Sequence, residues 1–466
     1  MTDKENKIPI DYQDIENILA DGEEKGESKV REVLRKALEL KGLDKHDVHT
    51  LMNVKRQSML EEVFHTAKRV KEEIYGKRVV IFAPLYISNF CCNDCLYCAF
   101  RSSNQDIVRR ALSQDEISCE VKTLINQGHK RILLVTGEAY PHEGFQYVLN
   151  AIETIYNTKI KNGEIRRVNV NIAPLTLEEF KELKAAKIGT YQIFQETYHR
   201  KTYSEVHVKG KKSNFEWRIT APDRAMEAGI DDVGIGVLFG LYDWKYEVLA
   251  LMQHIKHLET NFGVGPHTLS VPRLEPAEGS RIASNPPYAV TDRDFLKLVA
   301  ILRLAVPYTG IIMSTRENPE IRRETFELGV SQISAGSRTN PGGYSGEPFK
   351  EAAAQFQLGD HRPLDDVIRD IASLGFIPSF CTACYRLGRT GGDFMDLAKP
   401  GEIKHHCDPN ALSTFLEYLI DYGSPATNEV GKKLIETSLS GMTENTKKVA
   451  EGLMEKVRSG KRDIYC

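Results

Sequence analysis

Three cysteines in one short loop constrain this chain more than any other feature of its sequence. Cys91, Cys95 and Cys98 follow the strand-like run 79–88, and their spacing lets one loop turn all three sulfurs inward. A [4Fe–4S] cube needs four ligands, so three thiolates leave one iron open to a substrate or a cofactor. A structural zinc site is the alternative, but it would need a fourth ligand nearby and a second ligand pair downstream. The spacing therefore favours an iron–sulfur cluster with one open position.

Size and charge narrow the class of protein. The chain has 466 residues, which is too long for one compact unit and suits a large barrel with appendages. Its formal net charge of -3 gives no electrostatic reason to bind nucleic acid or an anionic membrane. No apolar run approaches the ~20 residues that span a bilayer. Because the cysteines cluster at metal-ligand spacing, we expect a reducing compartment and therefore a cytoplasmic enzyme.

The cysteine loop resembles the signature of the radical S-adenosylmethionine (radical SAM) enzymes. In that family three cysteines hold a [4Fe–4S] cluster, and S-adenosyl-L-methionine (SAM) chelates the fourth iron through its amine and carboxylate. The aromatic residue before the third cysteine, here Tyr97, usually offers its backbone to the adenine of SAM. The resemblance therefore implies a cluster held by Cys91, Cys95 and Cys98, with SAM beside it.

The pattern of apolar residues predicts an α/β fold. Residues 1–78 are helical in character, and we expect them to form a cap over one end of a barrel. From residue 79, short Val- and Ile-rich strands alternate with amphipathic helices, which is typical of parallel βαβ units. The expected strands are 79–88, 131–138, 167–173, 190–197, 232–240, 267–276, 310–317 and 330–337. Eight such units match a complete (β/α)₈ barrel of the TIM type over residues 79–340, with a helical C-terminal domain over 341–466.

Polar residues at the ends of the first strands are candidates for binding SAM, because the βα loops form the mouth of such a barrel. Gly137 and Glu138 resemble the family's glycine–glutamate motif, which meets the amine of SAM. Glu196 is a further SAM contact by the same resemblance, and Gly236 would let adenine approach closely. Asn169 is a candidate too, although asparagines at strand ends equally often bond to loop backbone.

The last three strands end in groups that suit an amino-acid substrate. Arg273, Glu275, Arg316 and Ser334 bring guanidinium, carboxyl and hydroxyl groups to the expected mouth, and an α-amino acid carboxylate requires such partners. The residues around Arg316 and Ser334 resemble the carboxylate clamp of radical SAM enzymes that act on aromatic amino acids. Ordinary salt bridges among loops are the alternative, which we expect for at least one of the arginines. Glu275 is a possible base for a phenol.

A second group of cysteines lies in the C-terminal domain. Cys381 and Cys384 are two residues apart, and Cys407 follows after twenty-two more. Three thiolates again leave one iron of a cube uncommitted. A Cys₃ zinc site with His405 or His406 as the fourth ligand is a fair alternative on spacing alone.

With this second group, the chain resembles the radical SAM tyrosine lyases that mature [FeFe]-hydrogenase. Segments 136–138, 194–199 and 231–240 support the resemblance. The tyrosine lyases of thiamine synthesis share the barrel but lack the C-terminal cysteines. They make 2-iminoacetate (dehydroglycine) for the thiazole ring, which is the alternative function. A non-catalytic scaffold that hands metal to a partner is a third hypothesis.

The resemblance implies a two-step activity. L-tyrosine is cleaved to p-cresol and dehydroglycine, and the fragment then yields carbon monoxide and cyanide. Both ligate an iron ion and form an Fe(CO)₂(CN) unit for the hydrogenase. The implied cofactors are SAM and two [4Fe–4S] clusters, one of which carries an additional labile iron. The implied partners are a reduced ferredoxin- or flavodoxin-type electron donor and other hydrogenase maturation proteins.

His267 opens the sixth expected strand and so lies at the bottom of the barrel, opposite SAM. With the resemblance, its imidazole is expected to ligate the labile iron, because histidine suits iron. The alternative is that His267 only bonds to loop backbone.

Overall fold

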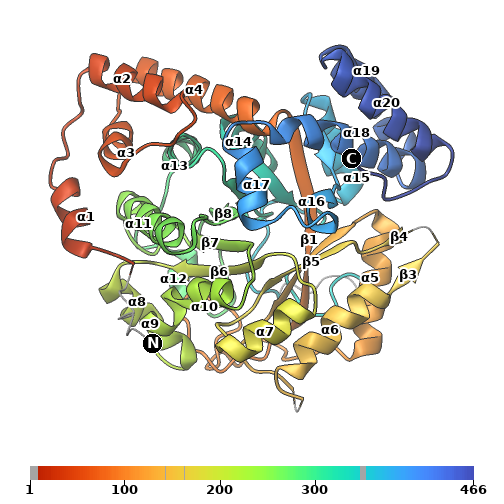
Figure 1. Cartoon of the computed structure of the whole chain (residues 1–466). Helices are drawn as coiled ribbons and strands as arrows, with labels where there is room; N and C mark the ends of the chain where they lie inside the picture. The colour runs from red at the N-terminus through yellow and green to blue at the C-terminus, as the bar shows by residue number, and fades with distance from the viewer. Residues whose placement is uncertain (1–8, 142, 162, 347–352) are drawn as a thin grey trace.

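Eight parallel strands close into a barrel in the computed structural model, which describes residues 9–141, 143–161, 163–346 and 353–466. The pairing of the first and last of these strands closes the ring (Figure 1). The barrel strands are β1 (Arg78–Ser88), β2 (Arg131–Thr136), β5 (Arg167–Asn171), β6 (Tyr191–Glu196), β7 (Val233–Val237), β8 (Thr268–Ser270), β9 (Gly310–Met313) and β10 (Val330–Ser334). The predicted (β/α)₈ barrel is confirmed. Each strand begins within one residue of its expected start, but most end earlier than expected, as β8 does at Ser270.

Burial on both faces explains why these segments form strands. Every residue of β1 is buried, as in parallel sheets that helices cover. On β5, Val168 and Val170 pack in the core beneath the outer helices. Asn169 and Asn171 alternate with them and therefore face the barrel interior.

Helices form the outer layer, and some begin with capping residues that the sequence displays. Ser113 and Glu116 form a capping box at the start of α5, and Thr176 and Glu179 form another at α7. The outer helices are α5 (Gln114–Gln127), α6 (Gln146–Asn157), α7 (Leu177–Ala185), α10 (Ala221–Glu227), α11 (Trp244–Phe262), α13 (Asp292–Ala305), α14 (Pro319–Leu328) and α15 (Leu364–Ser373). Loops carry α8 (Arg200–Val206), a 3₁₀ turn (Lys211–Ser213), α9 (Phe215–Ile219), α12 (Arg281–Ser284) and the hairpin β3 (Lys159–Ile160) and β4 (Gly163–Glu164). Within the described ranges, none of the helices is both long and apolar enough to cross a membrane.

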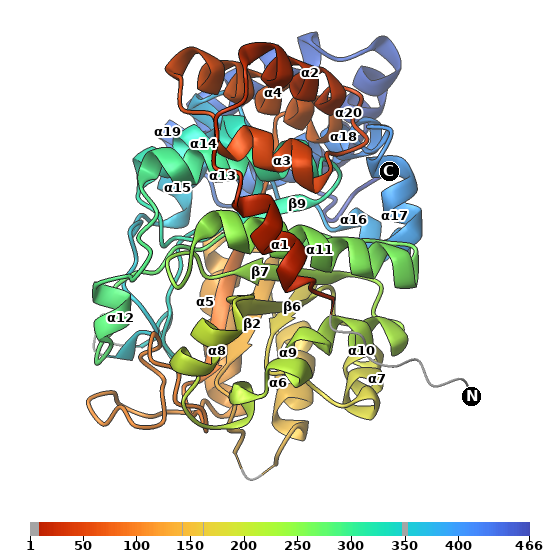
Figure 2. The same cartoon turned by 90° about the vertical axis from the view of Figure 1, so that its left-hand side faces the viewer.

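The N-terminal helices cover the flank of the barrel. They are α1 (Tyr12–Leu19), α2 (Glu27–Ala37), α3 (Lys45–Met52) and α4 (Gln57–Tyr75), while residues 1–8 of the expected cap lie outside the described ranges. Helix α4 packs against α13 and α14, and α1 packs against α11 (Figure 2). Through these contacts the N-terminal helices bury their apolar faces on the outer layer of helices.

The C-terminal segment adds a ninth strand that sequence patterns did not reveal. Strand β11 (Ile377–Ser379) pairs in parallel with β1 from Arg78 to Val80, before β2 joins β1 at Ala83. With three residues, one of them Pro378, it is too short for a periodicity to show. Helices follow as α16 (Ala383–Arg386), α17 (Gly391–Ala398), α18 (Ile403–Asp421), α19 (Pro425–Ser440) and α20 (Glu444–Arg458).

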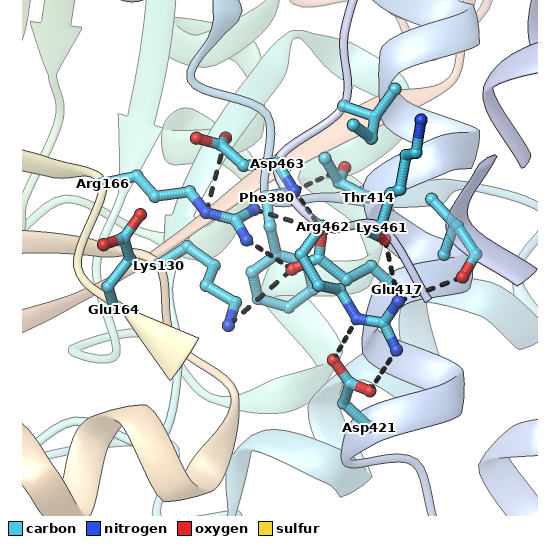
Figure 3. A network of polar contacts seen from close by, with 12 residues as sticks. Lys130, Glu164, Arg166, Phe380, Thr414, Glu417, Asp421, Lys461, Arg462 and Asp463 are labelled. Atoms are coloured by element: carbon cyan, nitrogen blue, oxygen red, sulfur yellow. Dashed lines mark hydrogen bonds and ion pairs between the residues drawn. The ribbon is translucent and has the colours of Figure 1, made fainter. Parts of the chain in front are cut away.

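A buried ion-pair network fixes α18 to the barrel (Figure 3). Glu417 lies 2.6 Å from a guanidinium nitrogen of Arg166, and both side chains are 2% exposed. The same carboxylate accepts a hydrogen bond from the backbone of Asp463, whose neighbour Arg462 pairs with Asp421 at 2.6 Å. Because Arg166 directly precedes β5, the network ties α18 and the chain end to the strand-start end of the barrel.

Candidate active site

A cavity of about 200 Å³ lies where the barrel strands end. Cys91, Cys95 and Cys98 all line it, together with residues from the ends of most barrel strands. This is the end of the barrel at which (β/α)₈ enzymes carry out their chemistry. The first cysteine loop is therefore part of an active-site cavity.

Backbone and side-chain contacts hold the cysteine loop in place. Leu96 donates its N–H to the Val206 carbonyl at 2.9 Å. Asn93 donates to the Glu138 carboxylate at 2.6 Å, and its amide lies 3.6 Å from the Cys91 sulfur. Gly137 is required, because a Cβ there would collide with the Phe90 carbonyl oxygen. The loop and the end of β2 thus form one rigid unit.

The described side chains do not form a site for a single metal ion. Sulfurs around zinc lie about 2.3 Å from one point, whereas those around a cube stand farther apart. Among the described residues, no three His, Cys, Asp or Glu side chains converge closely enough to hold one ion. Burial raises the pKa of Cys95 to about 12 and also raises the pKa of Cys98, so cluster binding must release protons.

Glu196 is the most constrained polar residue of this cavity. Its φ of 71° is unusual for a residue other than glycine, and such strain often marks functional sites. Its carboxylate lies 2.6 Å from Lys212 and 3.3 Å from Arg218. Burial works to raise the pKa of Glu196, but the two cations outweigh it and lower the pKa. Sequence reasoning missed both cations, although they stand in the loop after the fourth strand.

Tyr97 lines the cavity with Gly137 and Glu138, as the sequence predicted. Its hydroxyl forms a hydrogen bond of 2.9 Å with Nε2 of His207, which sequence reasoning did not single out.

Arg316 follows β9, and Ser334 ends β10, which pairs with β1. Both line the cavity, and the Arg316 guanidinium lies over the Phe356 ring, 3.3 Å from its centroid. The Ser334 hydroxyl accepts a hydrogen bond from the backbone of Thr315 at 3.1 Å. Burial lowers the pKa of Arg316, which still leaves a cation facing the cavity.

Arg273 and Glu275 lie outside the described lining of the cavity. Arg273 instead donates to Glu317 at 2.9 Å and pairs with Asp292 at 2.8 Å, which is the salt-bridge alternative. Burial, with Glu317 nearby, raises the pKa of Glu275 to about 7. Arg273 is thus engaged in salt bridges, whereas Glu275 stands near enough to Arg316 for their charges to interact.

Asn169 and Gly236 also lie outside the described lining. The Asn169 side chain accepts a hydrogen bond from the backbone of Thr190 at 3.1 Å. Asn171 lines the cavity in its place, because two strand residues, or about 7 Å, separate them along the barrel axis. At Gly236, a Cβ would lie 2.7 Å from the Ser270 carbonyl, so this glycine allows close packing of neighbouring strands.

A second cavity, of about 50 Å³, lies at the strand-start end of the barrel. It is lined by Cys381, Cys384, Cys407 and His267. Cys384 and Cys407 share a hydrogen bond, which lowers the pKa of Cys384 and raises the pKa of Cys407, so these two sulfurs face each other. The cysteines are thus gathered at one place despite their separation in sequence.

Two buried arginines that sequence reasoning missed also line the second cavity. Arg131 donates to the Cys381 carbonyl at 2.8 Å, but its Nε has no partner in the described structure. The same holds for Nε and one terminal nitrogen of Arg78. Buried polar groups are normally bonded, so free guanidinium N–H groups indicate an anionic occupant. Each arginine is the first residue of a buried strand, which is an unusual place for a charge. This is the one signal in the sequence that could have revealed them.

The zinc alternative takes His405 or His406 as the fourth ligand, but both histidines lie outside the described lining of the second cavity. The His405 side chain is 48% exposed and nearest to Glu402. His267, by contrast, is buried, and its Nε2 lies 3.0 Å from the Tyr385 hydroxyl.

Comparison with known proteins identifies the family. The model of the radical SAM superfamily matches residues 85–255, and that of the biotin and thiamin synthesis associated domain matches 270–377. A crystal structure of HydG, a maturase of the [FeFe]-hydrogenase, is 47% identical with a TM-score of 0.94 and covers 98% of this chain and 100% of its own. The chain belongs to the HydG family of radical SAM enzymes.

Two further similarities place the chain within this group. HydG from Carboxydothermus hydrogenoformans is 41% identical with a TM-score of 0.82, covering 95% of this chain and 96% of its own. The 2-iminoacetate synthase of Salmonella typhimurium is 32% identical over 347 residues, which are 74% of this chain and 89% of that protein. The HydG matches thus span both cavities, and the first cavity is that of a radical SAM enzyme using SAM and a [4Fe–4S] cluster.

Proposed function

We propose that this enzyme is a tyrosine lyase that matures [FeFe]-hydrogenase. It cleaves L-tyrosine to p-cresol and dehydroglycine, and it converts the fragment to carbon monoxide and cyanide. These ligate an iron ion, which leaves as an Fe(CO)₂(CN) unit. The observation that carries the proposal is the pair of three-cysteine cavities at opposite ends of one closed barrel.

At the first cavity, Cys91, Cys95 and Cys98 hold the cluster, which with SAM supplies the radical that attacks the substrate. Gly137 and Glu138 meet the amine of SAM, and the backbone of Tyr97 meets its adenine. The supporting observations are that all these residues line one cavity and that the loop is fixed to β2.

L-tyrosine binds through its carboxylate at the ends of β9 and β10. Arg316 supplies the charge and Ser334 a hydroxyl, since a buried guanidinium is well suited to a carboxylate. Glu196, held between Lys212 and Arg218, orients SAM from the side.

At the second cavity, Cys381, Cys384 and Cys407 hold a second [4Fe–4S] cluster, and His267 ligates the labile iron. Arg78 and Arg131 receive the carboxylate of dehydroglycine, which provides the anion that their free N–H groups require. A charged fragment released at one end of the barrel is thus captured at the other.

The 2-iminoacetate synthase function is the second candidate, favoured by the 32% identity to that enzyme. In that case, Cys381, Cys384 and Cys407 would hold zinc. Anaerobic iron and sulfide counts separate the two: about eight irons per chain for two cubes, against about four. A metal-delivering scaffold, the third candidate, predicts no p-cresol when SAM, reductant and tyrosine are added.

The chemistry also requires partners. We propose a reduced ferredoxin- or flavodoxin-type electron donor, other hydrogenase maturation proteins that receive the iron unit, and a cytoplasmic location. The need for one reducing electron per SAM and the oxygen-sensitive cysteine sites support this setting.

Infrared spectroscopy of a tyrosine reaction tests the proposal directly. Metal-bound carbon monoxide and cyanide bands that shift when ¹³C-labelled tyrosine is used are the expected result. Formation of p-cresol without such bands would instead support the 2-iminoacetate synthase.

A further inference from the structure

Tyr385 separates the second cavity from an outer groove. The groove has a volume of about 680 Å³, and Tyr385 lines both spaces. The groove is formed by the hairpin β3–β4, the loops before β6 and β7, and the loop after Cys384. Its lining includes Tyr156, Glu164, Arg167, Gly189, Asp232 and Arg386. One side chain thus stands between the proposed iron site and the outside of the barrel.

The hydroxyl of Tyr385 is hydrogen-bonded to Nε2 of His267, the nitrogen that would ligate iron. It lies 3.0 Å from Nε2 of His267, while Asp232 lies 3.7 Å from Nδ1 on the other side of the ring. At 3.7 Å, Asp232 is too far away for a hydrogen bond, so Nδ1 has no hydrogen-bond partner in the described structure, whereas Nε2 shares one with the Tyr385 hydroxyl. Iron and the Tyr385 hydroxyl cannot both bond to Nε2 at the same time.

We propose that Tyr385 is the gate through which ferrous iron enters and leaves the second site. The inference rests on the proposed function, in which His267 ligates a labile iron. In the closed state the hydroxyl caps Nε2 of His267. In the open state the ring turns into the groove and iron takes its place. The hydrogen bond at Nε2 is replaced by an iron–nitrogen bond. No electron is transferred, and no covalent bond is broken.

Residues of the groove contact the Tyr385 ring in its closed position. The Arg167 guanidinium stacks on the ring, and Gly189 makes room for that guanidinium, because a Cβ there would collide with it. The hydroxyl of Thr190 also interacts with Tyr385 and offers it a second partner. Asp232 lines the groove and supplies an oxygen ligand along the path of a ferrous ion.

Iron-binding measurements on the cluster-loaded full chain test the gate. The probe is ferrous ion alone, with uptake and release followed by competition with a ferrous chelator and by the EPR spectrum of the reduced second cluster. Tyr385→Phe removes only the competing hydroxyl and is expected to bind iron about three- to tenfold more tightly. Tyr385→Ala opens the passage and is expected to speed both uptake and release about tenfold or more.

Tyr156→Phe is the matched control, because Tyr156 lines the groove only and donates to the Lys187 carbonyl at 2.9 Å. It should bind and release iron like the wild type. Unchanged affinity in Tyr385→Phe overturns the proposal, and so do unchanged rates in a Tyr385→Ala protein with a full iron and sulfide count. If that variant loses its cluster, the affinity of Tyr385→Phe alone decides.

His267→Ala separates the gate from the proposed function. Loss of ferrous ion binding in this variant supports the iron site, whatever the Tyr385 variants do. If His267→Ala binds ferrous ion like the wild type, the iron site itself is wrong and the gate falls with it.

Discussion

Single cysteine substitutions should separate the two cavities. Cys95 lines the first and Cys384 the second. Cys95→Ala removes a cluster ligand beside SAM and is expected to abolish 5′-deoxyadenosine formation. Cys384→Ala is expected to leave p-cresol formation within about twofold of the wild type and to abolish iron-bound carbon monoxide. Chromatography of 5′-deoxyadenosine and p-cresol, with infrared spectra, measures both. Loss of p-cresol in Cys384→Ala would contradict separate sites.

Glu247 should make stability depend on pH. This buried residue of α11 accepts hydrogen bonds from the Thr197 hydroxyl and, at 2.8 Å, from the Tyr198 backbone. Burial raises the pKa of Glu247 to about 8. Between about pH 4.5 and 8, the folded chain therefore holds a proton that the unfolded chain lacks, and stability falls as pH rises, by up to about 1.4 kcal/mol per unit.

The Glu247→Gln variant cannot titrate and should lose less stability over this range. The melting temperatures of variant and wild type, compared at pH 5.5 and pH 8, measure the effect. A wild type that loses no more than the variant between these values would count against the raised pKa.

At the scale of elements, the docking of α18 depends on one buried ion pair. Glu417→Gln removes the buried carboxylate that pairs with Arg166 and leaves only the more exposed Asp463, 3.4 Å away, as its countercharge, so we expect a loss of about 3 kcal/mol in unfolding free energy. Asp421→Asn is the matched control on the same helix, because its pair with Arg462 is more exposed, and it should cost about 1 kcal/mol or less. Denaturant unfolding compares the two. Equal losses would show that burial of the pair contributes nothing.

Sequence patterns predicted the barrel strands because each is a short, mostly buried segment that contains aliphatic residues, as in β1 and β5. The cysteines of both sites were also predictable, since their spacing is local. Residues that reach a site only through the fold were missed. Arg78 and Arg131 meet Cys381 because β11 pairs with β1, and Tyr385 meets His267 across 118 positions of the chain. The sequence also does not show how far along the barrel axis a residue lies, so Asn169 was predicted at the cavity that Asn171 lines.

At the scale of the whole molecule, the barrel interior lies between the two cavities. Val80 and Phe82 both face inward on β1. Val80 lines the second cavity, and Phe82 lines the first cavity. Two strand residues, about 7 Å, therefore separate the linings. The fragment made at one end has only a short distance to travel.

Filling this interior should uncouple the two products. Thr268 on β8 is buried, and its hydroxyl lies 3.5 Å from the Gln192 amide, which borders the first cavity. Thr268→Phe is expected to keep p-cresol formation, which also reports correct folding, and to lower carbon monoxide about tenfold or more. Thr268→Val, of the same size as the wild type, is the control. A normal ratio of carbon monoxide to p-cresol in Thr268→Phe would exclude this route.

The pairing of β11 with the start of β1 has a consequence for the origin of two-site enzymes. The strand that leads into the Cys91 loop begins beside the strand that leads to Cys381. Grafting three cysteines onto a shorter relative would therefore not recreate the second site. The transplanted segment would also have to include a strand that pairs with the first strand of the host barrel.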